Sequence, residues 1–449
     1  MDKKKSFDVL IVGAGPAGYS SALALAPKYN VGIVECEAIG GVCLNCGCIP
    51  TKFLLHKAKE NLIQDSNICN EKLEKWKKEK EQLICNIRRN MEATLQNKNI
   101  EIIYGKACAI RKGDELIDVV VGENVYRAKW VVSAVGSKEI VPPIEGVEFG
   151  IEAGYVLDSK RLLDNSEKIS RLAIVGGGVI GLEFASFWNM LGSEVTILEK
   201  ETDILSELDD DVRAIVLRSM KRKGIEIITS AVVEEIDCEE QCVIYRHEEK
   251  RKIIECDKVL LATGRKSRVL TDAMWHAEKE NVVGFGDIEE IRSMFERSII
   301  YVGDANNKLM LAHTAYEESK VLKNIFQGKN DSVKYELVPK VVYSNPEMAW
   351  VGLNEKGCIE KNIEYYSCKK SMSYSGKYLI ENISEPGCCK LIFEKKSEKI
   401  IGAQLVGNGS SEMIAFLKLA IEKEMTQIEL QRFTFPHPSV SEIIYETLT

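Results

Sequence analysis

Two stretches of the chain show the same order of apolar and polar positions. The first has apolar runs at residues 7–12 and 31–34 around a helical pattern at residues 19–26. The second repeats this order, with apolar runs at residues 171–175 and 194–198 around another helical pattern. Buried strands that alternate with helices are typical of parallel α/β sheets. The pattern therefore predicts two strand–helix–strand motifs.

Each motif has a glycine-rich turn between its first strand and its helix. The glycines are Gly13, Gly15 and Gly18 in the first motif, and Gly176, Gly178 and Gly181 in the second. At the start of a helix, such glycines let a pyrophosphate approach the backbone amides. The second strands lead into Glu35 and Glu199, where a carboxylate can accept hydrogen bonds from a ribose. We expect two dinucleotide-binding folds and two bound nucleotides.

Glu199 also indicates which pyridine nucleotide binds. A carboxylate at this position can hold the 2′-hydroxyl of NAD but would repel the 2′-phosphate of NADP. Two like unit charges 4 Å apart repel by about 4 kcal/mol at an effective dielectric constant of about 20, which is about a thousandfold in binding. We therefore expect NAD rather than NADP.

The rest of the chain predicts one helical segment and several further strands. Residues 57–97 carry an apolar stripe at helical spacing between lysines and glutamates: Trp76, Leu83, Ile87, Met91 and Leu95. We expect one or two long helices with this stripe packed against the protein and the charged face in solvent. Further strands are expected at residues 100–104, 116–121 and 129–132. A different domain is expected after residue 337, with strands at residues 340–343, 390–393 and 400–406 and a helix at residues 411–423.

Composition narrows the class of protein. A chain of 449 residues with 45% hydrophobic and 29% charged residues is long enough for two to four globular domains. The net charge of −8 and the lack of a dense basic cluster predict no nucleic-acid partner. No apolar run reaches 18 residues, so we expect no membrane span. Fourteen cysteines without a framework spacing favour a reducing, cytoplasmic location. The lysines at the start lead directly into a strand, so we expect no signal peptide.

The candidate redox chemistry lies in residues 40–52, which read GGVCLNCGCIPTK. Cys43 and Cys48 are too far apart on a regular helix to be bridged, because a disulfide needs Cα atoms within about 7 Å. A bridge would require a distorted turn, which Gly47 and Pro50 favour. A strained and accessible disulfide is the labile kind. Cys46 forms a second redox spacing with Cys43, and whether Cys46 competes for the bridge stays open.

This segment resembles the signature of the class I flavoprotein disulfide reductases, most closely those that oxidise dihydrolipoamide. The resemblance covers essentially the whole chain. It implies that Cys43 exchanges with the substrate disulfide and that Cys48 faces the flavin as the charge-transfer thiolate. It also places Lys52 near the flavin N5 and pairs Lys52 with Glu183, which lies two residues after Gly181.

A candidate base lies near the end of the chain. His437 lies between two prolines, with Glu442 five residues later, so its backbone is restricted. A dithiol attacks a disulfide as its thiolate, and an imidazole can take the proton. Glu442 would fix the tautomer of the ring, as an aspartate does in a Ser-His-Asp triad. In the resembled family this pair comes from the partner subunit, which implies a homodimer.

The resemblance implies further cofactor contacts. Val135, Gly136 and Ser137 match the segment that returns to the flavin, with valine in place of the usual threonine. Asp304 matches the aspartate that contacts the ribityl chain. The residues after Gly264, from Arg265 to Arg268, depart from the family pattern. The other expected cofactor-binding residues are Pro16, Ala17, Gly41, Ala107, Val179, Ile180, Val232, Met310, Leu311, Ala312 and His313, and no metal is expected.

Together these features predict an α/β fold with two Rossmann-like dinucleotide-binding domains, for FAD and NAD, and a C-terminal α+β dimerisation domain. The expected limits are residues 1–140 for the first part of the FAD domain, 141–265 for the NAD domain, 266–336 for the second part of the FAD domain, and 337–449 for the interface domain. The expected reaction oxidises protein-bound dihydrolipoamide through the Cys43–Cys48 pair and FAD and reduces NAD+.

Because the chain begins close to its first strand, we expect the lipoyl group to come from another protein. This protein would belong to a 2-oxo acid dehydrogenase, glycine cleavage or acetoin complex. The main alternative is an NAD(P)H-dependent reductase of another small disulfide such as glutathione disulfide. A purely structural subunit is a further alternative, which the redox pair and the two nucleotide folds argue against.

Overall fold

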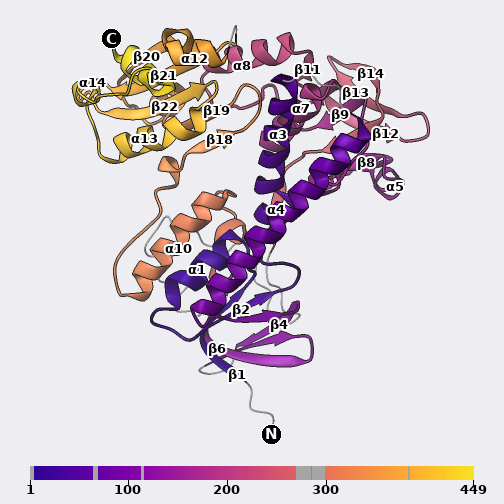
Figure 1. Ribbon diagram of the computed structural model, residues 1–449, viewed down its shortest axis with the longest axis vertical. Helices are drawn as coiled ribbons and strands as arrows, with labels where there is room; N and C mark the ends of the chain where they lie inside the picture. Colours follow the sequence, from indigo (N-terminus) through magenta and orange to yellow (C-terminus); the bar gives the residue numbers. More distant parts are fainter. Residues whose placement is uncertain (1–4, 64–68, 113–115, 269–284, 286–298, 383–384) are drawn as a thin grey trace. The chain divides into compact units, whose positions relative to one another are not determined.

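A computed structural model describes residues 5–63, 69–112, 116–268, 285, 299–382 and 385–449 (Figure 1). The chain divides into two compact units, each assembled from three separate segments. The first unit comprises Met1–Pro50, Lys77–Ile140 and Arg265–Tyr335, and the second comprises Thr51–Trp76, Val141–Gly264 and Glu336–Thr449. Each unit is described by itself below.

The first unit is built on a seven-stranded sheet with the order β3-β2-β1-β6-β5-β4, in which β17 also pairs with β6. Strands β3, β2, β1, β6 and β17 are parallel, and β4 and β5 continue antiparallel from β6. The strands are β1 (Lys5–Val12), β2 (Val31–Glu35), β3 (Glu101–Tyr104), β4 (Ala107–Lys112), β5 (Ile117–Val121), β6 (Asn124–Ser133) and β17 (Ile299–Tyr301). The same unit also contains a separate two-stranded antiparallel sheet, formed by β7 (Ser137–Glu139) and β16 (Arg265–Ser267).

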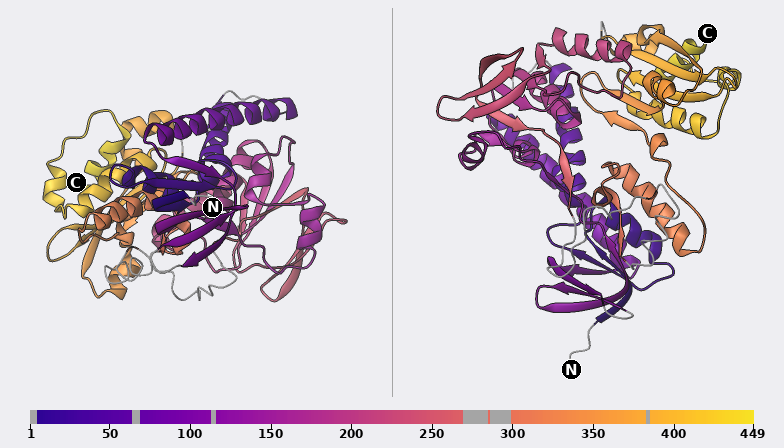
Figure 2. Two further views of the ribbon diagram at one scale, coloured as in Figure 1. Left: turned by 90° about the horizontal axis from the view of Figure 1, so that it is seen from below. Right: turned by 180° about the vertical axis from the view of Figure 1, so that it is seen from behind.

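Helices α1 (Pro16–Leu25) and α10 (Ala312–Phe326) pack side by side in this unit (Figure 1, Figure 2). The Ser319 hydroxyl lies 2.7 Å from that of Ser20 and 2.9 Å from that of Ser21. The unit also contains α2 (Gly41–Cys46) and the short 3₁₀ turn η2 (Gly303–Asn306). Asp304 therefore lies in a turn after the buried strand β17, and not in the strand itself.

Two helices follow the redox segment, α3 (Cys48–Ile63) and α4 (Asn70–Asn97), so the prediction of long helices is confirmed. The predicted apolar stripe is wrong at one position. Leu83 is exposed, and its neighbour Ile84 is buried instead. The buried face of the helix therefore includes position 84 and not position 83, one residue later than the helical spacing indicated.

The second unit contains a five-stranded parallel sheet with the order β11-β10-β9-β15-β8 and a separate antiparallel sheet, β12-β13-β14. These strands are β8 (Val156–Leu157), β9 (Arg171–Val175), β10 (Glu194–Leu198), β11 (Ile225–Ile228), β12 (Val232–Asp237), β13 (Cys242–His247), β14 (Lys250–Glu255) and β15 (Lys258–Leu261). The helices of this region are α5 (Val147–Glu152), α6 (Ser159–Leu163), α7 (Val179–Met190) and α8 (Asp210–Arg222).

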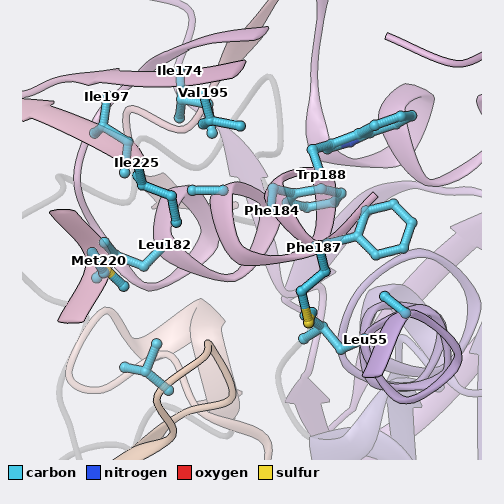
Figure 3. Close-up of a cluster of buried hydrophobic side chains, with 14 of the residues drawn as sticks. Leu55, Ile174, Leu182, Phe184, Phe187, Trp188, Val195, Ile197, Met220 and Ile225 are labelled. Atoms are coloured by element: carbon cyan, nitrogen blue, oxygen red, sulfur yellow. The ribbon is translucent and has the colours of Figure 1, made fainter. Parts of the chain in front are cut away.

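Helix α7 is buried on nearly all sides, which is why its sequence is almost entirely apolar. Figure 3 shows its side chains Leu182, Phe184 and Trp188 in a cluster with Ile174 of β9 and Ile197 of β10. Each of these five side chains is at most 2% exposed. This core holds the start of α7, and with it the second glycine turn, against the parallel sheet.

The C-terminal part of the second unit is an antiparallel sheet, β18-β19-β22-β21-β20, with helices. The strands are β18 (Lys340–Val342), β19 (Met348–Gly352), β20 (Tyr365–Ser371), β21 (Cys388–Glu394) and β22 (Ile400–Val406). The helices are α11 (Glu355–Glu360), α12 (Gly376–Glu381), α13 (Ser410–Glu422), α14 (Gln427–Gln431) and α15 (Ile443–Leu448), with 3₁₀ turns η3 (Tyr335–Leu337), η4 (Met372–Tyr374) and η5 (Val440–Glu442). The predicted α/β fold with two Rossmann-like domains and an α+β C-terminal domain is confirmed.

Among the helices that the structure describes, none is both long and apolar enough to cross a membrane.

A buried ion cluster joins α8 to the C-terminal sheet. Lys390 of β21 is 2% exposed, and its Nζ lies 2.9 Å from Asp209, 2.9 Å from Asp211 and 2.8 Å from Glu355. Burial alone would lower the pKa of Lys390, but the hydrogen bonds to the three carboxylates raise it above its ordinary value. The Gln404 amide also donates to Asp209 at 2.9 Å. Asp211 also pairs with Lys369 at 2.5 Å, whereas the buried Asp209 depends on Lys390 for its ion pair.

Replacing this cation should destabilise the second unit. Lys390→Met would leave Asp209, whose side chain is 4% exposed, without its cation, and losing one partner of a buried pair costs about 3–5 kcal/mol. We expect a clearly lower urea midpoint for the unfolding of the second unit, followed by circular dichroism. Lys396→Met, at an exposed site near the same strand, is the matched control. Equal midpoints for the two variants would contradict the role of the cluster.

Candidate active site

In the first glycine turn, two glycines are required by the protein's own backbone. A methyl group added at Gly13 would lie 2.3 Å from the carbonyl oxygen of Ala134, and one at Gly18 would lie 1.8 Å from that of Gly13. Gly15 is different, because the nearest described atom to such a methyl group is the Cα of Gly41, at 3.8 Å. Gly15 therefore leaves an open space at the start of α1.

The start of α1 suits an anionic group. Gly15 is its N-cap and Pro16 its first residue, and among the described residues no side chain caps the helix. The first turn also carries no acidic residue. Backbone N–H groups at a helix start bind phosphate when no side chain occupies them. The open space at Gly15 therefore fits the pyrophosphate of a dinucleotide.

The second glycine turn repeats this division of roles. A methyl group added at Gly176 would lie 2.4 Å from the carbonyl oxygen of Ala262. A methyl group added at Gly181 would lie 2.1 Å from the carbonyl oxygen of Gly176. At Gly178 no described atom lies within 4 Å of the added group. Gly178 is the N-cap of α7, and no described side chain caps this helix either. The second turn therefore fits a second dinucleotide.

The two strand-end glutamates are held in the same way. Glu35 accepts hydrogen bonds from the backbone N–H of Ala14 at 2.7 Å and of Glu37 at 2.8 Å. Glu199 accepts from Gly177 at 2.7 Å and from Glu201 at 2.9 Å. Each carboxylate is thus held by one N–H of its glycine turn and by the N–H of the residue two positions after it. This is the position from which a carboxylate can bind a ribose.

Asp304 belongs to a polar group in the first unit. The Ser137 hydroxyl donates to Asp304 at 2.5 Å, and Arg265 Nε donates to the same hydroxyl at 2.8 Å. Arg265 starts β16, which pairs antiparallel with β7, and the Arg268 N–H donates to the Gly136 oxygen at 2.8 Å. The segment that departs from the family pattern therefore forms a regular short ladder around Ser137. Val135 packs against the apolar core of the same unit.

Glu318 supports the Asp304 turn, and the sequence analysis missed it. It is fully buried in α10 and accepts hydrogen bonds from Gly303 N at 2.6 Å, Asn306 Nδ2 at 2.7 Å and Tyr335 Oη at 2.9 Å. Burial raises the pKa of Glu318 to about 7, although these three donors oppose the shift. The signal that could have identified it is a glutamate at a buried position of an amphipathic helix.

The two candidate redox cysteines lie on either side of a break between helices. Helix α2 ends at Cys46, Gly47 adopts φ −141° and ψ −108°, and α3 begins at Cys48. A methyl group at Gly47 would lie 2.9 Å from the Val42 oxygen and 3.4 Å from the Cys43 Cα. The backbone at Gly47 therefore packs closely against the backbone of Val42 and Cys43, immediately before Cys48. The predicted distorted turn at Gly47 is confirmed, and both cysteines are partly exposed.

Asn45 fastens this turn. Its side-chain amide donates to the Gly41 oxygen at 2.8 Å and to the Ile39 oxygen at 3.2 Å. Its side-chain oxygen accepts a hydrogen bond from Arg88 of α4 at 2.6 Å. Gly41 itself approaches Gly15, since a methyl group at Gly41 would lie 2.7 Å from the Gly15 Cα. The cysteine segment is thus anchored directly against the first glycine turn.

The structure brings Lys52 and Glu183 together in the second unit. The Lys52 ammonium lies 2.7 Å and 2.8 Å from the two oxygens of Glu183, whose side chain is 5% exposed. The Tyr343 N–H donates to Glu183 at 3.0 Å, and the Lys52 ammonium lies 4.8 Å from the centre of the Tyr343 ring. Tyr343 is a further residue that the sequence analysis missed, and no local pattern marks it.

His437 and Glu442 also meet, with Nδ1 2.8 Å from Oε2. Because a carboxylate can only accept, Nδ1 carries the proton and Nε2 is left able to take another. The His437 side chain is 82% exposed and the Glu442 side chain only 14%. The imidazole is therefore open to solvent, while the carboxylate that binds it is mostly buried.

The other predicted cofactor residues lie at element ends. Leu311 is the N-cap of α10, Met310 precedes it, Ala312 begins the helix and His313 is exposed. Val179 and Ile180 begin α7, and Val232 begins β12. Among the described residues, no group of three or more His, Cys, Asp and Glu side chains could hold a metal ion.

Comparison with known proteins identifies the family. Residues 7–319 match the model of the pyridine nucleotide-disulphide oxidoreductases, and residues 338–448 match the dimerisation domain of that family. The chain belongs to the pyridine nucleotide-disulphide oxidoreductase family. Its cofactors are FAD and NAD, as predicted, and the dimerisation domain supports a homodimer.

Relatives of known name support this assignment. The chain is 31% identical to the dihydrolipoyl dehydrogenase of Mycoplasma genitalium, covering 98% of this chain and 97% of the relative. It is 32% identical to that of Geobacillus stearothermophilus and 33% identical to that of Staphylococcus aureus, covering 98% of this chain and 95% of each relative.

Solved structures give the same picture of the fold. The HOCl-induced flavoprotein disulfide reductase RclA from Escherichia coli superposes with a TM-score of 0.84 at 26% identity, covering 98% of this chain and 99% of that one. LpdA from Mycobacterium tuberculosis superposes with a TM-score of 0.85 at 19% identity, covering 99% of each chain, and shows the fold alone. The chain is a flavoprotein disulfide oxidoreductase.

The two kinds of glycine should respond differently to substitution. Gly178→Ala places its methyl group in open space, so we expect an unchanged thermal unfolding midpoint but at least about tenfold weaker NADH binding, because about 1.4 kcal/mol of lost contact is a factor of ten. Gly181→Ala, which meets the Gly176 oxygen, should lower the midpoint itself. Unaltered NADH affinity in Gly178→Ala, measured by fluorescence titration, would contradict this placement of the nucleotide.

Proposed function

We propose that this protein oxidises protein-bound dihydrolipoamide to lipoamide and reduces NAD+ to NADH. The observation that carries the proposal is the Cys43–Gly47–Cys48 turn, packed against the first of two dinucleotide turns. Dihydrolipoyl dehydrogenases that match this chain over nearly its full length support the choice of substrate. The chemistry requires a dithiol, a disulfide that exchanges with it, and an acceptor for two electrons.

Cys43 is the exchanging thiol in this proposal. A substrate thiolate attacks the Sγ of Cys43 in a Cys43–Cys48 disulfide, so that a substrate–Cys43 bond forms and Cys48 leaves as a thiolate. The second substrate thiolate then displaces Cys43 and closes the lipoamide disulfide. The reduced cysteine pair would be reoxidised by bound FAD, which would supply the two-electron chemistry that links the dithiol to NAD+. The alternative is that Cys46, and not Cys48, forms the disulfide with Cys43. The serine variants described below distinguish these two pairings.

His437 is the base of the reaction. Glu442 accepts from Nδ1, and Nε2 can therefore take the proton of the attacking thiol. The exposure of the ring suits a group that acts on a substrate outside its own fold. We assign this pair to the site of the partner subunit, which makes the dimer necessary for activity. The family resemblance also implies that Lys52, which is paired with Glu183, lies near the flavin N5.

Glu199 selects NAD. Two backbone N–H groups hold its carboxylate beside Gly177, where a 2′-phosphate would meet a fixed negative charge. We also retain, as proposals, the three domain boundaries after residues 140, 265 and 336, a cytoplasmic location, and a lipoyl-bearing partner from a 2-oxo acid dehydrogenase, glycine cleavage or acetoin complex. The similarity to RclA favours one alternative, a reductase of another disulfide.

The assignment of the disulfide can be tested by one substitution. Cys48→Ser should abolish lipoamide turnover, because Cys43 is left without its disulfide partner, and should retain part of the diaphorase activity with an artificial acceptor. Cys46→Ser is the matched control and should keep most lipoamide turnover. Both activities are read from NADH absorbance on flavin-loaded protein. Full lipoamide turnover in Cys48→Ser, or its loss only in Cys46→Ser, would overturn the assignment.

The role of Glu199 predicts a change in nucleotide preference. Glu199→Gln removes the charge and keeps an acceptor for one backbone N–H, so the preference for NAD over NADP in kcat/KM should fall about 100-fold or more. Glu201→Gln, two residues on and exposed, should leave the ratio unchanged. A ratio within about threefold of the parent in Glu199→Gln would show that another group makes the selection.

A further inference from the structure

Arg88 of α4 contacts the cysteine segment within the first unit. Its Nη2 donates a hydrogen bond to the Asn45 side-chain oxygen at 2.6 Å. Asn45 lies on α2 between the two candidate redox cysteines, two residues after Cys43 and three before Cys48. The Asn45 amide in turn donates to the Gly41 oxygen at 2.8 Å. A guanidinium is therefore fixed to the short segment that carries both cysteines.

The Arg88 guanidinium forms no ion pair with a carboxylate of the described residues. Glu92 lies four residues further along α4, at a spacing that allows such a pair, but it accepts a hydrogen bond from the Tyr104 hydroxyl at 3.3 Å. The Arg88 Nε is buried, and no described atom accepts a hydrogen bond from it. Burying a polar group without a partner costs free energy. The first unit thus holds an unpaired cation beside the cysteines at a cost in stability.

An unpaired cation affects the redox equilibrium of neighbouring thiols. Arginine stays protonated, and the charge of a partly buried side chain is screened less by salt than that of an exposed one. Reduction of a Cys43–Cys48 disulfide takes up two electrons and one proton, breaks the S–S bond, and leaves one thiol and one thiolate. A cation attracts the thiolate but not the neutral disulfide. Arg88 therefore favours the reduced pair over the disulfide.

We propose that Arg88 is a positioning residue of the redox pair, which is held in place through Asn45 and raises the reduction potential of the Cys43–Cys48 disulfide. This inference rests on the proposed redox role of these two cysteines. In the exchange, the substrate dithiol gives up two electrons and closes as a disulfide, and the enzyme disulfide takes the electrons up and opens. A higher potential of the enzyme pair favours this step, so Arg88 sets how readily a dithiol is oxidised.

Two substitutions separate the charge of Arg88 from its hydrogen bond. Arg88→Gln removes the charge and keeps an amide donor, and Arg88→Lys keeps both the charge and a donor. Flavin-loaded protein is equilibrated with mixtures of reduced and oxidised dithiothreitol. We expect Arg88→Gln to need about a tenfold higher ratio of reduced to oxidised dithiothreitol for half-reduction, which is a potential lower by about 30 mV. Arg88→Lys should stay within about threefold of the parent.

The reduced fraction is read by an acid quench, alkylation with N-ethylmaleimide, and mass spectrometry of the peptide that contains Cys43 and Cys48. Arg89→Gln, at the exposed neighbouring position of α4, is the matched control and should match the parent. Equal flavin content shows that the variants fold, and Arg88→Met, without charge or donor, should shift the ratio at least as far as Arg88→Gln. An unchanged ratio in Arg88→Gln, or equal shifts in Arg88→Gln and Arg88→Lys, would overturn the proposal.

The dithiothreitol titration needs no lipoamide. A parent protein that forms the Cys43–Cys48 disulfide but fails to oxidise dihydrolipoamide would therefore overturn the proposed function and leave this test valid.

Discussion

The structure depends on glycine-to-backbone contacts at two turns. Gly18 lies against the backbone of Gly13, and Gly181 against that of Gly176, so that no side chain can separate strand from helix. The close approach aims the first N–H groups of α1 and α7 into open space at Gly15 and Gly178. A helix start that is uncapped by its own chain is an anion site. Both nucleotide positions, and the cysteine turn anchored against the first of them, follow from this packing.

Around these turns, glutamate carboxylates fix the backbone by accepting hydrogen bonds from its N–H groups. Glu35 and Glu199 each accept two backbone hydrogen bonds, and Glu318 holds the turn that carries Asp304. Glu183 accepts from both Lys52 and the Tyr343 backbone. A buried carboxylate with several donors has one orientation, because any rotation would leave it unpaired at a high cost. The polar groups needed for chemistry are thereby positioned before any ligand arrives.

The sequence predicted much of this because the decisive signals are local. Both strand–glycine–helix motifs, the break at Gly47 and the identity of the long helices follow from residues within one turn of each other. Glu318 and Tyr343 were missed, since each acts through contacts with other elements: Glu318 holds a turn that precedes its own helix, and Tyr343 meets Lys52 and Glu183, which are far away along the chain. The exposure of Leu83 shows the same limit, because spacing fixes a helical face to within one position.

The measurement that tests the central claim most directly compares initial rates on the purified, flavin-loaded protein. One assay supplies dihydrolipoamide and NAD+, and the other supplies glutathione disulfide and NADPH. The account predicts rapid NADH formation in the first assay and little NADPH consumption in the second. Turnover only in the second assay would mean that the family assignment is right but that both the substrate and the role of Glu199 are wrong.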